Sequence, residues 1–492
     1  MNTQQTPSVA LIAPDRGFTF LRTRTTRTTR TTRLAGTLAL TVILLPLTWA
    51  AGEPAINDPA LNANAPVARP TAPTPAPAPA KLNEKNTGAP IDIADMLAPL
   101  LARHNLPGMA AAVIKDGQVI ALGASGVRKR GDTTPVTTSD LWHLGSCTKS
   151  MTATLCAVLV DRAELSWDQT LAATFPFALD HMHAAYKPVT LEQLLTNRGG
   201  FPGELKEGGL WSKLWRFKGT DTAARRLILD TITSRAPNTK PGAFEYSNAG
   251  FSVAGLMAEQ MTDATWEDLM QREVFAPLGI TSAGFGAPGV VASPDAKPGE
   301  KTVVDQPRGH VLPLGTPMDP GLSADNPSAI GPAGRVHMTI GDWAKYIAAH
   351  LDGEAMLRNP VAAPANDIAP APGVAIEPGG ARTLSRPGEL LKPESWRKLH
   401  AAAPTIAPKD NTYAMGWSVT QRPWAKGKNP GDIGLALTHN GSNTMWYCVA
   451  WIAPERNLGV IVCVNQAGTG AKAADEAASA LIGRFAKRRD GE

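Results

Sequence analysis

The sequence predicts an α+β fold: one antiparallel sheet built from both ends of the folded chain, flanked by helices, with a mostly helical lobe inserted between the ends. Near the amino end, two β-prone runs surround Asp116-Gly117, a dipeptide that favours a tight hairpin turn. Near the carboxyl end, three more β-prone runs precede an alanine-rich helical pattern over 471–487; they cover 435–438, 445–452 and 458–464. Because helical patterns fill the sequence between these strand groups, we expect the groups to join in a single sheet.

The composition excludes several classes of protein. With 43% hydrophobic and 18% charged residues among 492, the chain has enough apolar material for a large core and is neither disordered nor fibrous. The net charge of +5 arises entirely before residue 52, where six arginines face one acidic residue. The rest of the chain is neutral, so no nucleic-acid partner is expected.

The first 51 residues have the pattern of an export signal. An arginine-rich, acid-poor stretch ends at Arg33, and an apolar block over 34–51 finishes in small residues, with cleavage expected near Ala50 or Ala51. We therefore expect residues 1–51 to direct the protein to the periplasm or out of the cell. An uncleaved anchor is the alternative, because the block reaches the lower length limit for a membrane span, and only then is a membrane partner expected.

Residues 52–88 are rich in alanine and proline and predict an extended, semi-rigid linker, which leaves 89–492 as the folded domain. Within it, a helical pattern over 91–104 precedes the hairpin. Segments 283–333 and 357–390 are rich in proline, glycine and alanine, and we expect surface excursions that either shape a cleft or are tolerated insertions. The clearest helical patterns between the ends cover 149–165, 191–197, 222–234, 248–262 and 340–351.

The four cysteines are too few to form a disulfide framework in a chain of this length. Cys448 and Cys463 flank a turn between two predicted strands, so a cross-strand disulfide is geometrically possible. Two small, buried apolar residues are the alternative, and the sequence leaves that choice open.

A Ser-x-x-Lys motif carries the chemistry. Gly145 offers a tight turn, and the apolar spacing that follows predicts a helix with Ser146 at its N-terminus. Lys149 then projects from the same face one turn later. A serine there lies where backbone N–H groups favour developing negative charge, with an amine close enough to influence its proton. A simple N-cap serine is the alternative interpretation, because Ser-x-x-Lys also occurs by chance.

The context of that motif resembles the serine β-lactamase and penicillin-binding superfamily, and more narrowly its class C β-lactamase-related branch. The resemblance runs from about Pro107 to Asn465 and rests on Ser-x-x-Lys after a hairpin, followed by LEQLLTNRGGFPG, GAFEYSNAGFSVAGLMAE, GPAGRVHMTIGDWAKY and LTHNGSNTMWYCVAWI. It implies the β-lactamase/transpeptidase-like α/β sandwich, with 89–492 as its catalytic domain. It also implies an acyl-enzyme mechanism without a metal or organic cofactor.

The resemblance implies a role for each motif residue. Ser146 would be the acylated nucleophile, Lys149 its proton partner and Tyr246 the general base, while Asn248 would orient the substrate and Lys149. His439 and Gly441 stand where the lactamases carry Lys-Thr-Gly. The backbone N–H groups of Ser146 and Ser442 would form the oxyanion hole. A desolvated lysine and a tyrosine facing cations, both with lowered proton affinity, could together activate the serine.

His439 in place of a lysine points toward the esterase and peptidase members, because a neutral imidazole holds a substrate carboxylate less firmly than an ammonium group. We therefore expect an exported serine hydrolase acting on a small ester or amide, including cell-wall D-amino-acid peptides. A β-lactamase or D-Ala-D-Ala carboxypeptidase is the alternative within the enzymes. An inactive relative that binds cell-wall peptide is the alternative outside them. The sequence predicts no oligomeric state.

Two other histidine sites carry weaker signals. His181 and His183 have the spacing of a two-histidine metal clip but lie in a predicted loop without a third ligand, so no metal is expected there. His143, three residues before the serine, is expected to be a packed residue rather than a second base.

Overall fold

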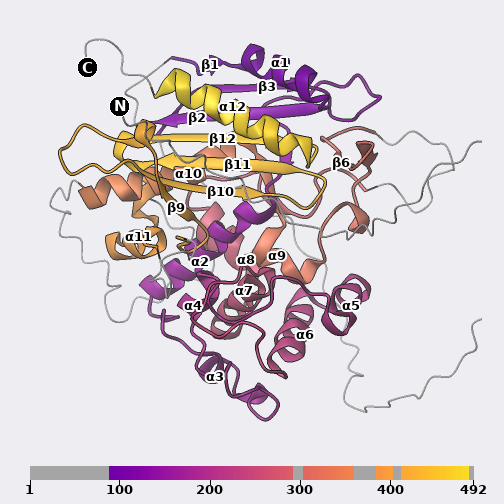
Figure 1. Ribbon diagram of the computed structural model, residues 1–492, viewed down its shortest axis with the longest axis vertical. Helices are drawn as coiled ribbons and strands as arrows, with labels where there is room; N and C mark the ends of the chain where they lie inside the picture. Colours follow the sequence, from indigo (N-terminus) through magenta and orange to yellow (C-terminus); the bar gives the residue numbers. More distant parts are fainter. Residues whose placement is uncertain (1–87, 292–302, 359–383, 403–411, 487–492) are drawn as a thin grey trace, which may run out of the picture. The chain divides into compact units, whose positions relative to one another are not determined.

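The computed structural model describes residues 88–291, 303–358, 384–402 and 412–486. The expected export signal over 1–51 lies outside these residues, as does nearly all of the expected linker. A seven-stranded sheet with the order β1-β3-β2-β12-β11-β10-β9 dominates this part of the chain (Figure 1). Its strands are β1 (Ile91–Asp92), β2 (Gly108–Lys115), β3 (Gln118–Gly126), β9 (Ser418–Gln421), β10 (Leu435–Gly441), β11 (Tyr447–Ala453) and β12 (Leu458–Val464).

The two ends of the domain meet between β2 and β12, which confirms the predicted sheet. These strands are antiparallel, with Met109 opposite Val464 and Val113 opposite Val460. The predicted hairpin is confirmed as β2 and β3, and Asp116 and Gly117 both adopt positive φ at its turn. Only the short β1 runs parallel to its neighbour, β3, among the strand pairs of this sheet.

The helix expected over 91–104 begins later than predicted, as α1 (Ala94–His104). Ile91 and Asp92 instead form β1, because their backbone pairs with the edge of β3. The Asp92 side chain also accepts the backbone N–H of Ala94 at 2.9 Å, so it satisfies a free donor at the helix start.

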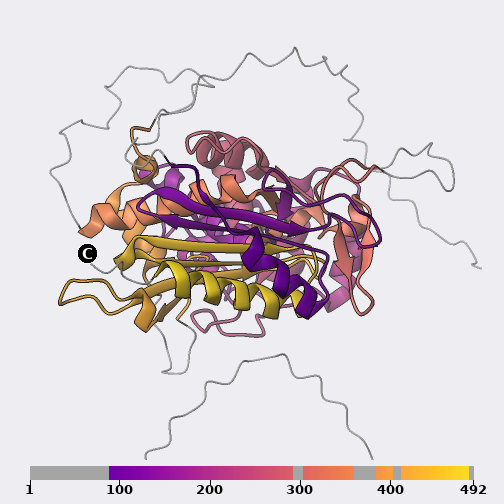
Figure 2. The same ribbon diagram turned by 90° about the horizontal axis from the view of Figure 1, so that it is seen from above.

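Alternate residues of β2 face two separate cores, as the two-residue period of a strand requires. Ala111 and Val113 pack with α1 and with α12 (Thr469–Phe485) on one face of the sheet. Ala112 and Ile114 belong to the larger core on the other face, which includes α10 (Ile340–Arg358). Figure 2 shows α1 and α12 on one side of the sheet and α10 on the other. The expected sandwich of sheet and helices is therefore confirmed.

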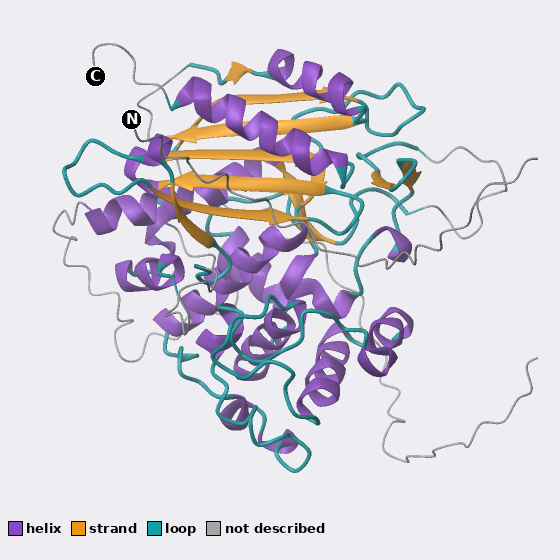
Figure 3. Ribbon diagram, in the orientation of Figure 1, coloured by secondary structure: helices purple, strands orange, loops and turns teal. Residues whose placement is uncertain are grey.

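The helical lobe lies beyond the β9 edge of the sheet (Figure 3). Buried helices α2 and α7 form its centre, and α2 lies where lobe and sheet meet. None of the described helices is long and apolar enough to span a membrane. The lobe contains α2 (Thr148–Asp161), α3 (Leu171–Thr174), α4 (Leu191–Leu195), α5 (Leu210–Arg216), α6 (Asp221–Thr233), α7 (Asn248–Thr262), α8 (Trp266–Leu269), a π-helical turn (Met270–Phe275) and α9 (Gly331–Gly334); α11 (Pro393–His400) packs against α2.

A buried ion cluster joins α6 to α7 and α8. Arg225 is fully buried and donates to Glu259 on α7 and to Glu267 on α8. Removing one member of such a cluster leaves its partner charge buried without compensation.

We expect Arg225→Met to lower the free energy of unfolding by about 3–5 kcal/mol, because it strands the buried Glu259 carboxylate. Urea unfolding followed by circular dichroism measures the change. Arg226→Met, at the neighbouring exposed position, is the matched control. We expect it to lower the free energy of unfolding by about 1 kcal/mol or less. Equal losses in the two variants would show that the cluster adds no special stability.

The expectation of a surface excursion over 283–333 is wrong for much of that segment. It contributes β5 (Gly284–Phe285) to a small sheet with β4 (Leu141–His143) and β8 (Val336–Thr339), and it forms the hairpin of β6 (Gly309–Val311) and β7 (Thr316–Met318). Arg308, His310 and Asp325 are buried. The second excursion, 357–390, falls mostly outside the described residues.

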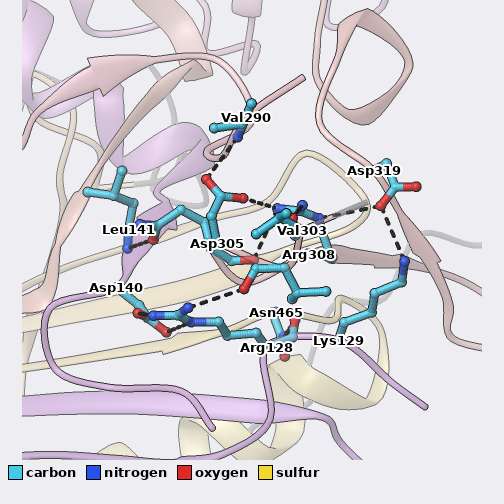
Figure 4. Close-up of polar contacts among 12 residues, drawn as sticks. Arg128, Lys129, Asp140, Leu141, Val290, Val303, Asp305, Arg308, Asp319 and Asn465 are labelled. Carbon is cyan, nitrogen blue, oxygen red and sulfur yellow. Dashed lines mark hydrogen bonds and ion pairs between the residues drawn. The ribbon is translucent and has the colours of Figure 1, made fainter. Parts of the chain in front are cut away.

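Charged side chains, drawn in Figure 4, form bonds within this segment and between it and the residues that follow β3. Arg308 Nη1 donates to Asp305 at 3.1 Å, and Lys129 Nζ donates to Asp319 at 3.3 Å. Arg128 forms an ion pair with the buried Asp140, at the entry to β4. Internal pairing of charges therefore fixes a segment whose composition suggested a surface excursion.

Candidate active site

A single 3-10 turn, Gly145–Cys147, connects β4 to α2. It contains Ser146, the predicted nucleophile, and is named the nucleophile turn. Gly145 has φ +47°, and a Cβ there would lie 2.3 Å from the backbone N of Ser442. Only glycine combines that backbone conformation with so close an approach. Ser146 is therefore placed at the start of α2 and directly beside the loop that follows β10.

Lys149 is fully buried one turn below Ser146, and each of its three possible donor hydrogens has an acceptor. Its Nζ lies 3.1 Å from Ser146 Oγ, 2.7 Å from Asn248 Oδ1 and 2.9 Å from the carbonyl oxygen of Ala333. Burial lowers the pKa of Lys149 from 10.5 to about 7, against a smaller opposing effect of Cys147. Near neutral pH, an unprotonated Lys149 can keep its bonds to Asn248 and Ala333 and accept the hydroxyl proton of Ser146.

Tyr246 lies opposite, just before the N-terminus of α7. Lys149 Nζ lies 4.7 Å from the centre of its ring, and its hydroxyl is near enough to the Ser146 side chain for the serine to lower the pKa of the phenol. The structure thus brings all three predicted catalytic side chains together. The residue as a whole is 37% exposed, whereas its hydroxyl is buried beside the serine.

The expected lowering of proton affinity holds for Lys149 but not for Tyr246. Burial of the hydroxyl raises the pKa of Tyr246, and the interaction with the Ser146 side chain opposes this only in part. The lysine nitrogen lies over the face of the tyrosine ring, and it is itself partly neutral near pH 7. The resting state therefore has a protonated phenol and a lysine able to act as a base.

Strand β10 forms the other wall of the site. A Cβ on Gly441 would lie 2.0 Å from the carbonyl oxygen of Leu144 and 2.8 Å from the backbone N of Ser146. The strand therefore touches the nucleophile turn backbone to backbone, and the N–H groups of Ser146 and Ser442 belong to neighbouring segments. This is the arrangement that a pair of oxyanion donors requires.

We expect Gly441→Ala to reduce ester turnover by about 10²-fold or more, because the added methyl group must push β10 away from Ser146 and separate the two donors. Initial rates, corrected for the folded fraction from thermal unfolding, measure the effect. Gly431→Ala is the matched control, since a Cβ at Gly431 meets no atom within 4 Å. A Gly441→Ala enzyme with normal turnover would contradict this role for the contact.

His439 reaches the site but is almost completely buried, and both ring nitrogens are occupied. Nδ1 lies 2.5 Å from the carbonyl oxygen of Asn440 and must donate to it, and Nε2 forms a hydrogen bond with the hydroxyl of Tyr413 at 3.0 Å. Both nitrogens of the imidazole are therefore engaged by groups of the protein itself.

A model of the family described as Beta-lactamase matches residues 93–484. The chain belongs to the β-lactamase family. Penicillin-binding protein 4 of Amycolatopsis lactamdurans is 31% identical over 256 residues, covering 51% of this chain and 61% of that protein. Unguisins hydrolase ungD' of Aspergillus campestris (strain IBT 28561) is 25% identical over 276 residues, covering 54% and 48%. The chain thus spans about half to three fifths of the length of these two relatives.

Solved structures of a penicillin-binding protein homologue and of a β-lactamase share the fold. The octameric penicillin-binding protein homologue from Pyrococcus abyssi superimposes with a TM-score of 0.54 at 20% identity, covering 79% of this chain and 76% of that one. A β-lactamase from Sulfitobacter sp. EE-36 gives 0.55 at 19% identity, covering 80% and 97%. The predicted β-lactamase/transpeptidase-like fold and the predicted family are both confirmed.

Two residues of this β-lactamase-family site could not be predicted from the sequence. Tyr413 precedes β9 outside any motif, and no sequence signal connects it with His439. Asn197 occupies a loop at φ +58°, and its side chain accepts the N–H of Ser247 at 3.0 Å. It thereby fixes the start of α7, which carries Asn248, and positive φ is a conformation that asparagine tolerates better than most residues.

The cysteines of this β-lactamase-family chain are all free thiols. Cys448 lies directly opposite Cys463 in the β11–β12 register, as the sequence suggested. Its Sγ, however, lies 3.5 Å from Cys147 Sγ. In this structure Cys448 and Cys463 are therefore two small buried residues without a disulfide, which is the second of the two possibilities that the sequence left open.

The two histidines of the predicted loop have separate partners. His181 Nε2 pairs with Asp230 at 3.1 Å, whereas His183 Nδ1 accepts the N–H of Ala185 at 3.2 Å. Among the described residues, no group of three or more potential ligands is arranged to hold a metal ion.

Proposed function

We propose that the protein is an exported serine hydrolase that forms an acyl-enzyme at Ser146 and transfers the acyl group of a small ester or amide to water. The contact between Lys149 Nζ and Ser146 Oγ carries the proposal. A buried lysine with a pKa near 7 can accept the serine proton, which makes the hydroxyl a competent nucleophile. The Arg-rich and apolar leader supports export.

In the proposed mechanism, Ser146 Oγ attacks the substrate carbonyl while Lys149 accepts its proton. The backbone N–H groups of Ser146 and Ser442 stabilise the oxyanion. Tyr246, which holds its proton at neutral pH, donates to the leaving group as the tetrahedral intermediate collapses, and Lys149 returns the proton to the phenolate. Water then attacks the acyl-enzyme with the same groups in reverse order.

The internally paired His439 supports an ester or uncharged amide over a substrate that presents a carboxylate to β10. A β-lactamase or a D-Ala-D-Ala carboxypeptidase must bind such a carboxylate, and a ring whose nitrogens are both occupied offers it no free donor. That activity remains the second candidate, because the relative from Amycolatopsis lactamdurans is a penicillin-binding protein.

Hydrolysis rates for three classes of substrate, together with one labelling experiment, test the proposal. We expect a fluorophosphonate to add one phosphonyl group per chain, located on the Ser146 peptide by mass spectrometry. The p-nitrophenyl esters of short acids should be hydrolysed faster than D-Ala-D-Ala peptides or nitrocefin. Rapid nitrocefin hydrolysis without esterase activity would support the second candidate. If Ser146 takes no label, the remaining interpretation is an inactive relative that binds cell-wall peptide.

A further inference from the structure

A buried imidazole lies directly behind the nucleophile turn. His143 is the last residue of β4, and its Nδ1 lies 3.1 Å from the backbone N of Gly145. On its other side, Nε2 lies 2.7 Å from Asp325 Oδ1. Both side chains are almost fully buried. The expectation that His143 is a packed residue is therefore confirmed, but its polar contacts go beyond packing.

These contacts settle which ring nitrogen carries the hydrogen. A backbone N–H can only donate, so Nδ1 must accept from Gly145. Nε2 then carries the hydrogen and donates to the Asp325 carboxylate. The carboxylate therefore fixes the tautomer that Gly145 requires.

Asp325 is itself held in place. Its second oxygen accepts from Arg335 Nε at 2.7 Å, at the start of the small-sheet strand β8. The carbonyl oxygen of the preceding residue, Ala324, accepts from Asn443 Nδ2 at 3.2 Å. Asn443 directly follows Ser442. Residues 324–325 therefore contact both sides of the proposed oxyanion site: the Gly145 side through His143, and the Ser442 side through Asn443.

We propose that His143 is a positioning residue for catalysis: its Nδ1 holds the Gly145 N–H and thereby sets the direction of the Ser146 N–H toward the oxyanion. The peptide plane before Gly145 and the two backbone dihedrals of that glycine, whose φ is positive, together determine the next peptide plane, which contains the Ser146 N–H. Asp325 and Arg335 act through His143. This inference rests on the proposed function, because it assigns a role within that same site.

Two conservative substitutions separate the two contacts of His143. In His143→Asn, the amide oxygen can occupy the position of Nδ1 and accept from Gly145, but the side chain is too short to reach Asp325. In His143→Gln, the amide nitrogen can reach Asp325, but the acceptor for Gly145 is lost. Glutamine is also the closer match in size, so a purely structural role would favour it.

We expect His143→Gln to lower kcat for a p-nitrophenyl ester by about tenfold, with KM changed less than about twofold, because one oxyanion donor is misdirected. The rate of fluorophosphonate labelling should fall in parallel. His143→Asn should keep both rates within about threefold of the wild type. His350→Gln is the matched control: it also removes a buried imidazole, one that bonds to His400, and should affect only thermal stability.

All rates are divided by the folded fraction at the assay temperature. Equal losses in the Asn and Gln variants, a Gln variant as fast as the wild type, or a loss confined to KM would each overturn the proposal for His143. A wild type that neither turns over esters nor takes the label would instead overturn the proposed function, and the inference with it. Because the wild type is measured in the same series, the two failures are distinguishable.

Discussion

Ser146→Ala is expected to lower ester turnover by about 10⁴-fold or more and to abolish the fluorophosphonate adduct, because the attacking oxygen is removed. The backbone N–H of residue 146 stays, and Lys149 keeps its bonds to Asn248 and the Ala333 carbonyl. The fold should therefore be unchanged, and weak residual catalysis by the oxyanion donors should remain. Stopped assays of p-nitrophenyl ester hydrolysis and intact-protein mass spectrometry measure both effects.

Ser150→Ala provides the matched control on the same helix. It also removes a buried hydroxyl, one that donates to the Cys147 carbonyl at 2.9 Å, but this hydroxyl has no part in the proposed chemistry. We expect its turnover to stay within about threefold of the wild type, since it removes only one hydrogen bond. Similar losses in both variants, or an adduct that persists in Ser146→Ala, would show that the nucleophile lies elsewhere.

Lys149→Met is expected to reduce kcat/KM by about 10³-fold, because it removes the base while preserving the length and burial of the side chain. In the wild type, a Lys149 pKa of about 7 predicts that kcat/KM rises with pH up to about 7 and is level above it, since only neutral lysine accepts the serine proton. The variant should lose this dependence. A variant that keeps the same pH profile would assign the titration to another group.

Lys149→Met should also change how the free energy of unfolding depends on pH. The folded pKa of Lys149, about 7, is below its ordinary value of 10.5, so between these values the unfolded chain binds more protons than the folded chain. The contribution of Lys149 to stability therefore rises with pH across that window. Lys149→Met should remove this slope and should be at least as stable as the wild type at pH 7, as measured by denaturant unfolding at several pH values.

Local patterns predicted the parts of the fold that depend on neighbouring residues. Asp116-Gly117 marked the hairpin, and the apolar spacing after Ser146 marked α2. Ser146, Lys149 and Tyr246 could be identified from motifs, and the structure brings their side chains together.

Other features depend on contacts between distant residues and left no local pattern. Tyr413 faces His439, and Asp325 faces His143, from loops without periodicity. The segment around Arg308 was misjudged because its composition resembles a surface loop, whereas its charges are satisfied internally. The pKa of Tyr246 depends on burial, which the motif does not specify.

The meeting of both chain ends in one sheet has a consequence for biosynthesis. The serine and lysine lie in the first third of the chain, but β10, which supplies the opposing N–H at Ser442, begins only at Leu435. A ribosome must therefore complete nearly the whole polypeptide before both sides of the proposed oxyanion site can meet. If Ser146 is the proposed nucleophile, partial translation products and truncations that end before Leu435 should therefore be inert toward acylating agents.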